Sequence, residues 1–497
     1  MEDCSKRLLD LVVLGGLLLV SCSEPPVAPR GGPIVLITLD SLRADVVTGM
    51  GGEPELTPHL ADLIREADWA GRAVALSSAA VPSMASLFTG LRPWQHHALH
   101  DGAARLSPEL LTLPKALRSA GYRTAGYHTG HWYTGEFGYD LGFDVFEDLG
   151  KGGEAAERLA GLGEGRQFVW VHIPEPQAPY VRRDWLLPRL SEPAGSLPRL
   201  PHTIEPVQLA AYFDPAVPLP DEERRRFWAL YRLNAAWADE RLGRLLEALR
   251  SSGQWNRTVL AVTSNHGEEF GESGQIEHGG NLGRELLEVP LIIKLPAGSA
   301  RRIAVLAGQR VSAGRLWATL VEVAGGKVPP AAAPSLFRRA APAVLSELYL
   351  TNGTNKFSLL EGDDQLLWES RFAPAERDYY RARAELLAGP PEPGDAGDAG
   401  DSKGEAISPA AVASIARRLG AAFAATPPLT GNRGPSLSLQ RWGRRGSKPV
   451  HDPLRRAEMA RRLAATWTTF LTEELPPAEE AREWLEAFPL PPAAPQP

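Results

Sequence analysis

Runs of consecutive apolar residues recur along the chain, and each run ends in polar residues. They predict strands over 34–39, 122–127, 168–172, 258–263 and 288–294. Apolar positions at helical spacing alternate with them and predict helices that begin at Thr57-Pro58 and that cover 83–88, 113–120 and 221–252. Because uninterrupted apolar strands are typical of sheets covered on both faces, we expect an α/β fold with a doubly wound, mostly parallel sheet flanked by helices.

The apolar stripe of the longest helix, 221–252, has a structural interpretation. Its members recur at helical spacing and indicate packing against a core rather than a ligand site. The stripe consists of Phe227, Tyr231, Trp237, Leu242, Leu245, Leu246 and Leu249.

The pattern changes near Val344, where short runs over 344–350, 356–360 and 365–368 are separated by hairpin signals. They predict a small antiparallel C-terminal subdomain. The stretch 389–404 is rich in Gly, Pro and Asp and is predicted to be disordered, and Ser408-Pro409 and Asp452-Pro453 are predicted to begin helices. We interpret the basic stretch 433–448 as a solvated loop in preference to a phosphate-binding patch.

The first residues predict export. Lys6-Arg7 precede an apolar run over 8–20 that is followed by Ser21-Cys22, which is typical of a secretory signal. Residues 19–22 also resemble a bacterial lipobox, so we expect a protein of the bacterial cell envelope that is lipid-anchored to the membrane at Cys22. A plain signal peptide or a short membrane anchor is the alternative. With Cys22 lipidated and Cys4 removed, no thiol would remain for a disulfide.

The expected organisation follows from these patterns. It comprises a signal peptide (1–22), a tether (23–33), an α/β domain (34–300), a C-terminal subdomain (301–388), a disordered linker (389–407) and a helical tail (408–497). The net charge of −7 gives no electrostatic reason to expect a nucleic-acid partner.

Polar residues follow several of the predicted strands. Asp40, His172 and the pair Asn265-His266 come at or just after strand ends, where open α/β sheets bind ligands. The stretch 77–90 is built of small residues, turns at a proline and enters a helix, which is a common anion-binding geometry because backbone N–H groups are free there. Together these residues could surround one cation and one anionic group, as the hydrolysis of a sulfate or phosphate ester requires.

A series of motifs in the same order resembles the sulfatases and their relatives in the alkaline phosphatase superfamily. The motifs are Leu39 to Asp45, Pro82 to Gly90, His172 to Tyr180, Ser264 to Glu269, and His278-Gly279. The resemblance extends from Pro33 to about Pro296 and implies a metal-assisted hydrolase of sulfate or phosphate esters. It implies metal ligands at Asp40, Asn265 and His266, substrate contacts at His172, Gln177 and His278, and catalytic positions at Ala80, where the nucleophile stands, and His278.

The departures from the family pattern lie at the positions of the nucleophile, of a metal ligand and of substrate contacts. Ala80 stands where the family carries Cys (converted to formylglycine), Ser or Thr, so no formylglycine is expected. Asn265 replaces a metal-binding Asp, Gln177 replaces a substrate-contacting His, and Met84 replaces an Arg that helps to hold formylglycine. With Asp40 as the only clear carboxylate, we expect one divalent ion (Ca, Mg, Mn or Zn), weakly held.

Two functions from different classes follow. The first is a sulfatase-family hydrolase of sulfate or phosphate esters whose turnover is reduced or lost, with a nearby hydroxyl of Ser77, Ser78 or Ser83, or a metal-activated water, as the remaining sources of a nucleophile. The second is a non-catalytic envelope protein that binds sulfated or phosphorylated glycans. Both interpretations require an anionic ester or glycan as the ligand.

Overall fold

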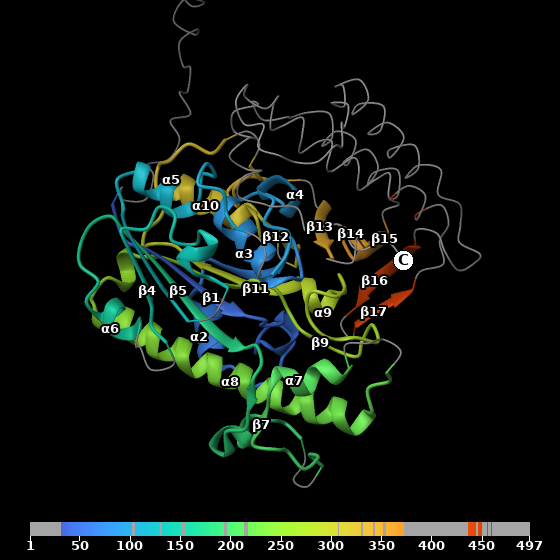
Figure 1. Cartoon of the computed structure of the whole chain (residues 1–497). Coiled ribbons are helices and arrows are strands. Elements are labelled where there is room, and N and C mark those ends of the chain that lie inside the picture. Colours follow the sequence, from blue (N-terminus) through green and yellow to red (C-terminus); the bar gives the residue numbers. More distant parts are fainter. Residues whose placement is uncertain are drawn as a thin grey trace, which may run out of the picture.

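The structure, a computed structural model, describes residues 31–449 and the single residues 455 and 459; within that range 102–104, 130–131, 151–154, 193–195, 213–216, 307, 330–331, 341–342, 351–353, 372–435 and 444–445 are not described. An eight-stranded sheet forms the centre, in the order β12-β2-β11-β8-β1-β5-β3-β4 (Figure 1). Its strands are β1 (Ile34–Asp40), β2 (Trp69–Val74), β3 (Arg123–His128), β4 (Val145–Asp148), β5 (Gln167–Pro176), β8 (Val259–Ser264), β11 (Glu288–Lys294) and β12 (Val311–Ser312).

The predicted doubly wound, mostly parallel sheet is confirmed. Strands β8, β1, β5, β3 and β4 are parallel to one another, whereas β11 runs antiparallel to both β2 and β8. All seven residues of β1 are buried, as its apolar sequence predicts.

Helices cover both faces of this sheet (Figure 1). Ile34 and Leu36 of β1 belong to the core under one group of helices, whereas Val35 and Ile37 belong to the core under the other group. The first group is α3 (Ala80–Thr89), α5 (Leu113–Ser119) and α10 (Arg315–Val323), and the second is α2 (Pro58–Glu66), α6 (Ala155–Ala160) and α8 (Asp221–Ser251). The short helices are α4 (Pro93–His96), α7 (Pro206–Leu209) and α9 (Arg284–Leu287).

Two elements near the predicted site differ from the sequence prediction. Helix α3 begins at Ala80 rather than at Ser83, because Pro82 lies in the first turn, where an amide needs no partner within the helix. Strand β5 continues past His172 to Pro176. Its pairing with β3 ends at Val171, so the prolines that follow interrupt no hydrogen bonds on that side.

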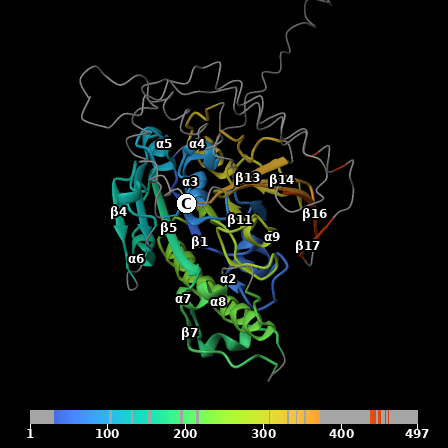
Figure 2. The same ribbon diagram turned by 45° about the vertical axis from the view of Figure 1, so that its right-hand side comes forward.

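A second, antiparallel sheet lies beside the first (Figures 1 and 2). Its strands, in order, are β13 (Ala343–Tyr349), β14 (Thr354–Glu361), β15 (Asp364–Arg371), β16 (Ser436–Gly443) and β17 (Gly446–Pro449). The predicted antiparallel C-terminal subdomain is confirmed in its first strands. The Glu347 amide donates to the Leu76 carbonyl at 2.8 Å, which joins this sheet to the segment that leads into α3.

The last two strands correct the prediction of a basic loop within a helical tail. Residues 436–439 alternate polar and apolar side chains, which is a strand pattern, and β16 pairs with β15. The buried Trp442 indole donates to the Gln365 side chain at 2.8 Å. The predicted signal peptide, most of the tether, the disordered linker, the helix expected at 408 and the start of the helix expected at 452 lie outside the described residues, and residues 455 and 459 within the latter are helical.

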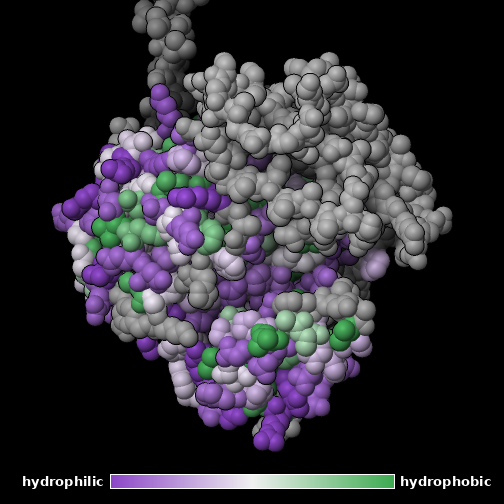
Figure 3. All heavy atoms as spheres, viewed as in Figure 1, coloured by the Kyte–Doolittle hydropathy of each residue, from purple (hydrophilic) through white to green (hydrophobic). Residues whose placement is uncertain are grey.

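Two short pairs of strands lie outside these two sheets, β6 (Tyr180–Val181) with β7 (Thr203–Ile204) and β9 (Glu269–Phe270) with β10 (Ile276–Glu277). In the part of the chain that is described, no helix has the length and apolar character needed to cross a bilayer. Apolar residues on the face in Figure 3 form small separate groups on a mostly hydrophilic surface.

Candidate active site

One buried carboxylate lies at the centre of the site. Asp40 is the last residue of β1, and its Oδ1 accepts a hydrogen bond from Asn265 Nδ2 at 2.7 Å. His172 Nε2 lies 3.3 Å from Oδ2, and His266 Nε2 lies 3.5 Å from Oδ1. Burial alone would raise the pKa of Asp40, but His172 and the Asn265 amide lower it to about 2. Asp40 is therefore a carboxylate whose charge is offset by its own neighbours.

Hydrogen bonds fix the roles of the two imidazoles. His266 Nδ1 lies 2.8 Å from the Gly267 carbonyl, which can only accept, so the proton is on Nδ1 and the Nε2 lone pair faces Asp40. Burial, reinforced by the positive charge of His278, lowers the pKa of His266 to about 3, which keeps it neutral. Thr38 Oγ1 accepts from the Trp170 indole at 2.9 Å and can donate to His172 Nδ1 at 2.9 Å, which leaves the Nε2–H of His172 toward Asp40.

The orientation of the Asn265 amide decides what this residue offers to the site. Its Oδ1 accepts from the backbone amides of Ser41 at 3.1 Å and His266 at 2.8 Å. The NH₂ group must therefore point inward, where it reaches Asp40 and the Tyr133 hydroxyl, each at 2.7 Å. The sequence predicted a carbonyl oxygen as a metal ligand at this position, whereas the structure directs that oxygen to the backbone.

These residues do not fit a tightly held divalent cation. Hard cations require several oxygen ligands, and the site offers one carboxylate, which accepts a hydrogen bond from the Asn265 amide. Over the described residues, no group of three or more His, Cys, Asp or Glu side chains has an arrangement that could hold a metal ion. Among the residues that the structure describes, Asp40 accepts one hydrogen bond, from Asn265, and the Nε2 atoms of His172 and His266 are buried without a hydrogen-bond partner, so a cation here would meet a single carboxylate and an inward NH₂ group.

The N-terminus of α3 is also satisfied from within the chain. Ala80 is the first residue of the helix and is fully buried. Its amide lies 3.4 Å from Asp101 Oδ2, and the Val81 amide donates to Asp101 Oδ1 at 2.7 Å. The sequence predicted free amides for a bound anion here, but a carboxylate of the protein accepts them. Burial raises the pKa of Asp101 above its ordinary value.

The hydroxyls near Ala80 are engaged with the backbone. Ser78 Oγ donates to the Asn281 carbonyl at 2.6 Å, and Ser83 Oγ donates to the Asn265 carbonyl. Ser77 Oγ accepts from the Ala79 amide at 3.4 Å. Among the described residues, none of these three hydroxyls forms a hydrogen bond with a His, Asp or Glu side chain that could act as a base.

His278 supplies a cation beside the carboxylate centre. Its Nδ1 lies 2.9 Å from Glu268 Oε1, and its ring stacks on that of His266 with centroids 4.3 Å apart. Burial would lower the pKa of His278, but Glu268 and other acidic neighbours raise it to about 10, so the ring is an imidazolium. His278 Nε2 lies 3.2 Å from the amide nitrogen of Gln177. Because both atoms are donors when His278 is charged, the imidazolium favours the opposite orientation of the Gln177 amide, with its oxygen toward His278.

The predicted site residues therefore lie together at one edge of the sheet. Asp40, His172, Asn265 and His266 meet in one cluster, and Gln177 and His278 adjoin it. Tyr133 joins Ala80 to the cluster, because its hydroxyl lies 3.4 Å from the Ala80 carbonyl. Their catalytic and binding roles stay predictions.

Sequence reasoning missed Asp101, Tyr133 and Glu268 as members of the site. Glu268 lies in the motif Ser264 to Glu269, two residues after His266, and this position could have indicated that it belongs to the site. Asp101 and Tyr133 lie outside the helices and strands and carry no periodic pattern, so only the fold brings them to Ala80.

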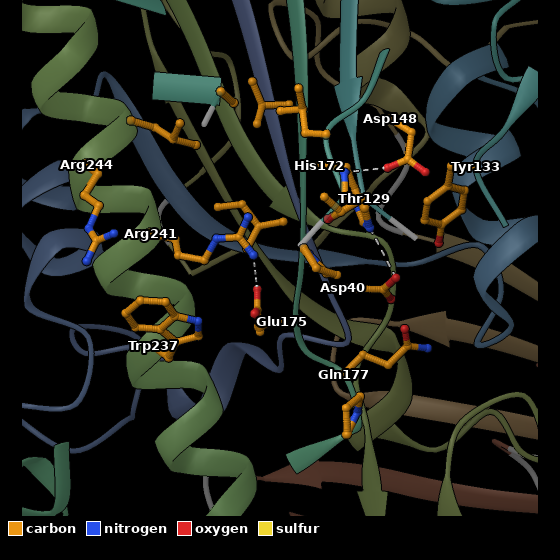
Figure 4. A pocket seen from close by; sticks show the side chains of 18 of the residues that line it. Asp40, Thr129, Tyr133, Asp148, His172, Glu175, Gln177, Trp237, Arg241 and Arg244 are labelled. Carbon is orange, nitrogen blue, oxygen red and sulfur yellow. Dashed lines mark hydrogen bonds and ion pairs between the residues drawn. The ribbon is translucent and has the colours of Figure 1, made fainter. Parts of the chain in front are cut away.

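A cavity of about 700 Å³ opens beside this cluster (Figure 4). Asp40, His172 and Gln177 line one part of it, and Trp237 and Arg241 of α8 line another. Trp237 was predicted to be core packing, but it is only partly buried and contributes to the cavity wall. The other residues of that predicted stripe are buried.

Comparisons with known proteins identify the scaffold. The sequence model of the Sulfatase family matches residues 33–158 and 172–326, more than half of the chain. The multifunctional alkaline phosphatase superfamily protein PehA of Trinickia caryophylli is 26% identical over 388 residues, which cover 60% of this chain and 74% of PehA. Iduronate 2-sulfatase of Homo sapiens is 33% identical over 96 residues, only 19% of this chain and 17% of that enzyme.

Solved structures share the fold. The phosphonate monoester hydrolase of Silicibacter pomeroyi has a TM-score of 0.52 at 17% identity and covers 84% of this chain and 99% of its own. The phosphonate monoester hydrolase of Agrobacterium radiobacter has a TM-score of 0.52 at 18% identity, over 69% of this chain and 90% of its own. A protein solved with its substrate D-glucosamine-2-N,6-O-disulfate has a TM-score of 0.52 at 17% identity, over 69% and 89% of the two chains.

Proposed function

Because the chain belongs to the sulfatase family but carries Ala80 at the position of the nucleophile, we propose that it binds sulfate or phosphate esters and hydrolyses them slowly or not at all. The observation that carries this proposal is the start of α3. A methyl group stands where the attacking atom would be, and the amides of Ala80 and Val81 are held by Asp101. A methyl group can neither attack an ester nor ligate a metal.

The groups around Ala80 do not replace the missing nucleophile. A serine hydroxyl attacks an ester only when a neighbouring base takes its proton. Ser78 and Ser83 instead donate to backbone carbonyls, and the Nε2 lone pair of His266 faces Asp40 rather than a hydroxyl. Neither Ser78 nor Ser83 therefore has an activating partner in this arrangement.

A weakly held metal is part of the same proposal. Members of this family generally use a divalent cation, which stabilises the charge that develops on the ester oxygens. In this chain Asp40 and His266 would be the remaining ligands, and the inward NH₂ group of Asn265 opposes a cation there. We therefore expect affinity for divalent ions far below that of a site with several carboxylates.

Cations near the cluster support retained binding of an anionic ester. His278 is an imidazolium next to Gln177, and Arg241 lies on the cavity wall. The names of the similar proteins include sulfated and phosphonate substrates, so sulfate and phosphate esters are both candidate ligands. Of the two candidate functions, an impaired site favours the second, non-catalytic binding of sulfated or phosphorylated glycans.

The experiment measures binding and turnover on the same sample. Purified wild-type protein is titrated calorimetrically with 4-nitrophenyl sulfate and with 4-nitrophenyl phosphate, and the mixtures are then assayed for released 4-nitrophenol. We expect binding of at least one ester, with the ester recovered intact. Multiple turnovers per protein molecule would contradict the proposal, and so would the absence of binding to both esters.

We also propose that the protein is exported and held at the cell envelope through a lipid on Cys22. The support is the sequence alone, in which the apolar run over 8–20 leads into a lipobox-like stretch. Expression in a bacterial host with radiolabelled palmitate tests it. Wild-type protein should carry the label in the membrane fraction, and Cys22→Ser should not.

A further inference from the structure

The cavity of about 700 Å³ has two chemically different ends (Figure 4). At one end, Asp40, His172 and Gln177 belong to the cluster described above. The other end is walled by α8 and by the segment that follows β6. We call its four side chains, Arg183, Trp237, Arg241 and Arg244, the arginine arm.

The arginine arm carries more positive than negative charge. Arg241 pairs with Glu175 at 2.6 Å. Arg183 donates to two neutral acceptors, Asn234 Oδ1 at 2.8 Å and the Val181 carbonyl at 3.2 Å. Within the described residues Arg244 makes no ion pair. Burial lowers the pKa of Arg183, Glu175 opposes that shift, and Arg241 adds to it. The arm therefore holds three guanidinium groups against one carboxylate, Glu175, which is paired with Arg241.

Trp237 holds two of these guanidinium groups in place. The Arg183 guanidinium carbon lies 4.8 Å from the centroid of the Trp237 ring, and that of Arg244 lies 5.3 Å from it. Stacking on an aromatic face restrains a guanidinium while its N–H edge stays available for a planar pair of anionic oxygens. Trp185 packs edge-on against Trp237, with centroids 6.1 Å apart, and is 56% exposed. It presents an aromatic surface next to the arm.

We propose that the arginine arm is a second anion-binding site, which holds a sulfate, phosphate or carboxylate group of the same ligand whose ester group lies at the Asp40 end. This inference rests on the proposed binding function and narrows its ligand to molecules with at least two anionic groups. Guanidinium groups bind such oxygens through paired, charge-assisted hydrogen bonds. A cavity of about 700 Å³ is within the size range of sites for drug-sized ligands, so a short, multiply sulfated oligosaccharide meets both requirements.

The test uses calorimetric titration of the full-length protein with a multiply sulfated heparin tetrasaccharide, with its desulfated counterpart, and with 4-nitrophenyl sulfate. The variant is Arg244→Gln, at an exposed position of α8 that a glutamine suits. Arg225→Gln is the matched control, because Arg225 is exposed on the same helix and does not line the cavity.

We expect Arg244→Gln to weaken tetrasaccharide binding by about tenfold, the loss of one charge-assisted contact. Binding of 4-nitrophenyl sulfate should stay unchanged, and Arg225→Gln should match the wild type with both ligands. The desulfated tetrasaccharide should bind far more weakly than the sulfated one. A second variant, Arg241→Gln, should weaken tetrasaccharide binding in the same direction.

Several results would overturn the inference. They are a wild type that does not bind the sulfated tetrasaccharide, an Arg244→Gln variant that binds it as the wild type does, and an equal loss in the Arg225→Gln control. If the monoester binds and stays intact while Arg244→Gln has no effect, the arginine arm is not an anion-binding site, but the proposed function stands. If the tetrasaccharide depends on Arg244 but is hydrolysed, the arm stands and the proposal of impaired turnover is wrong.

Discussion

Asp101 Oδ1 accepts a hydrogen bond of 2.7 Å from the amide of Val81, the second residue of α3. This contact places a carboxylate of the protein at the helix N-terminus, where the helix dipole and free amides favour a bound anion. The same end of the helix carries Ala80 in place of a nucleophile. The loss of the reactive atom and the occupation of the anion site therefore occur at one point of the fold.

Removing the charge of Asp101 should open this anion site. Asp101→Asn keeps an oxygen that can accept from Val81 but removes the negative charge that repels an incoming sulfate. We expect inorganic sulfate to bind the variant about three- to tenfold more tightly than the wild type, a change on the order of 1 kcal/mol. Calorimetric titration with sulfate measures it. Asp140→Asn, at an exposed position, is the control, and an unchanged affinity in Asp101→Asn would refute the role of this carboxylate.

Restoring the carboxylate at position 265 should restore metal affinity. Asn265→Asp would place a second negative charge beside Asp40, where the amide now lies 2.7 Å away, and a divalent cation would relieve the repulsion. We expect Mn²⁺ or Ca²⁺ to raise the melting temperature of Asn265→Asp, alone or with Ala80→Thr, and to leave the wild type almost unchanged. Asn256→Asp, which is exposed, controls for non-specific binding. Equal metal responses in all variants would mean that Asp40 and His266 do not belong to a latent metal site.

The hydroxyl of Tyr133 should stabilise the cluster. It accepts from Asn265 Nδ2 at 2.7 Å in a fully buried setting, so Tyr133→Phe leaves an amide hydrogen without a partner. We expect the free energy of unfolding to fall by about 1–3 kcal/mol in urea titrations. Tyr212→Phe is the matched control, because the Tyr212 hydroxyl makes no hydrogen bond with the described residues. A loss no larger than that of the control would show that this bond does not stabilise the cluster.

Glu269 should make stability depend on pH. Burial, followed by repulsion from Glu272, Glu285 and Glu268, raises its pKa from 4.5 to about 7. The folded state disfavours the charged form of Glu269. The contribution of this group to the free energy of unfolding is therefore fully present below pH 4.5 and is lost as pH rises through about 7. Glu269→Gln should therefore gain stability relative to the wild type between pH 5 and pH 8, by up to about 3 kcal/mol.

Urea titrations at several pH values measure that difference for Glu269→Gln. The exposed Glu109→Gln serves as the control, and its difference from the wild type should not change with pH. A pH-independent difference for Glu269→Gln would contradict the assignment of the group with a pKa of about 7 to Glu269.

The central sheet and the cluster at its edge were predictable because both depend on local pattern. The apolar run of β1 predicts a strand buried on both faces, and Asp40 follows from its place at the strand end. Strands β2 and β4 were missed, since only two residues of β2 and none of β4 are buried and their sequences lack a continuous apolar run. The antiparallel direction of β11 follows from chain connection, which no local pattern encodes.

The details that decide the chemistry were not predictable in the same way. Whether Asn265 presents oxygen or hydrogen to the site depends on where the Ser41 and His266 amides lie. The partner of Val81 is Asp101, a loop residue whose position only the tertiary structure fixes. Trp237 shares the spacing of its buried neighbours on α8 and was indistinguishable from them until the cavity beside it was known.

The most direct test of impaired hydrolysis is chelator-sensitive turnover in the wild-type protein. Release of 4-nitrophenol from 4-nitrophenyl sulfate and 4-nitrophenyl phosphate is measured with added Mn²⁺, with EDTA, and in Asp40→Ala. The structure leads us to expect the same background rate in all three, because Ala80 provides no nucleophile and the Asn265 amide donates to Asp40. Turnover that requires Mn²⁺, stops with EDTA and disappears in Asp40→Ala would contradict the proposal.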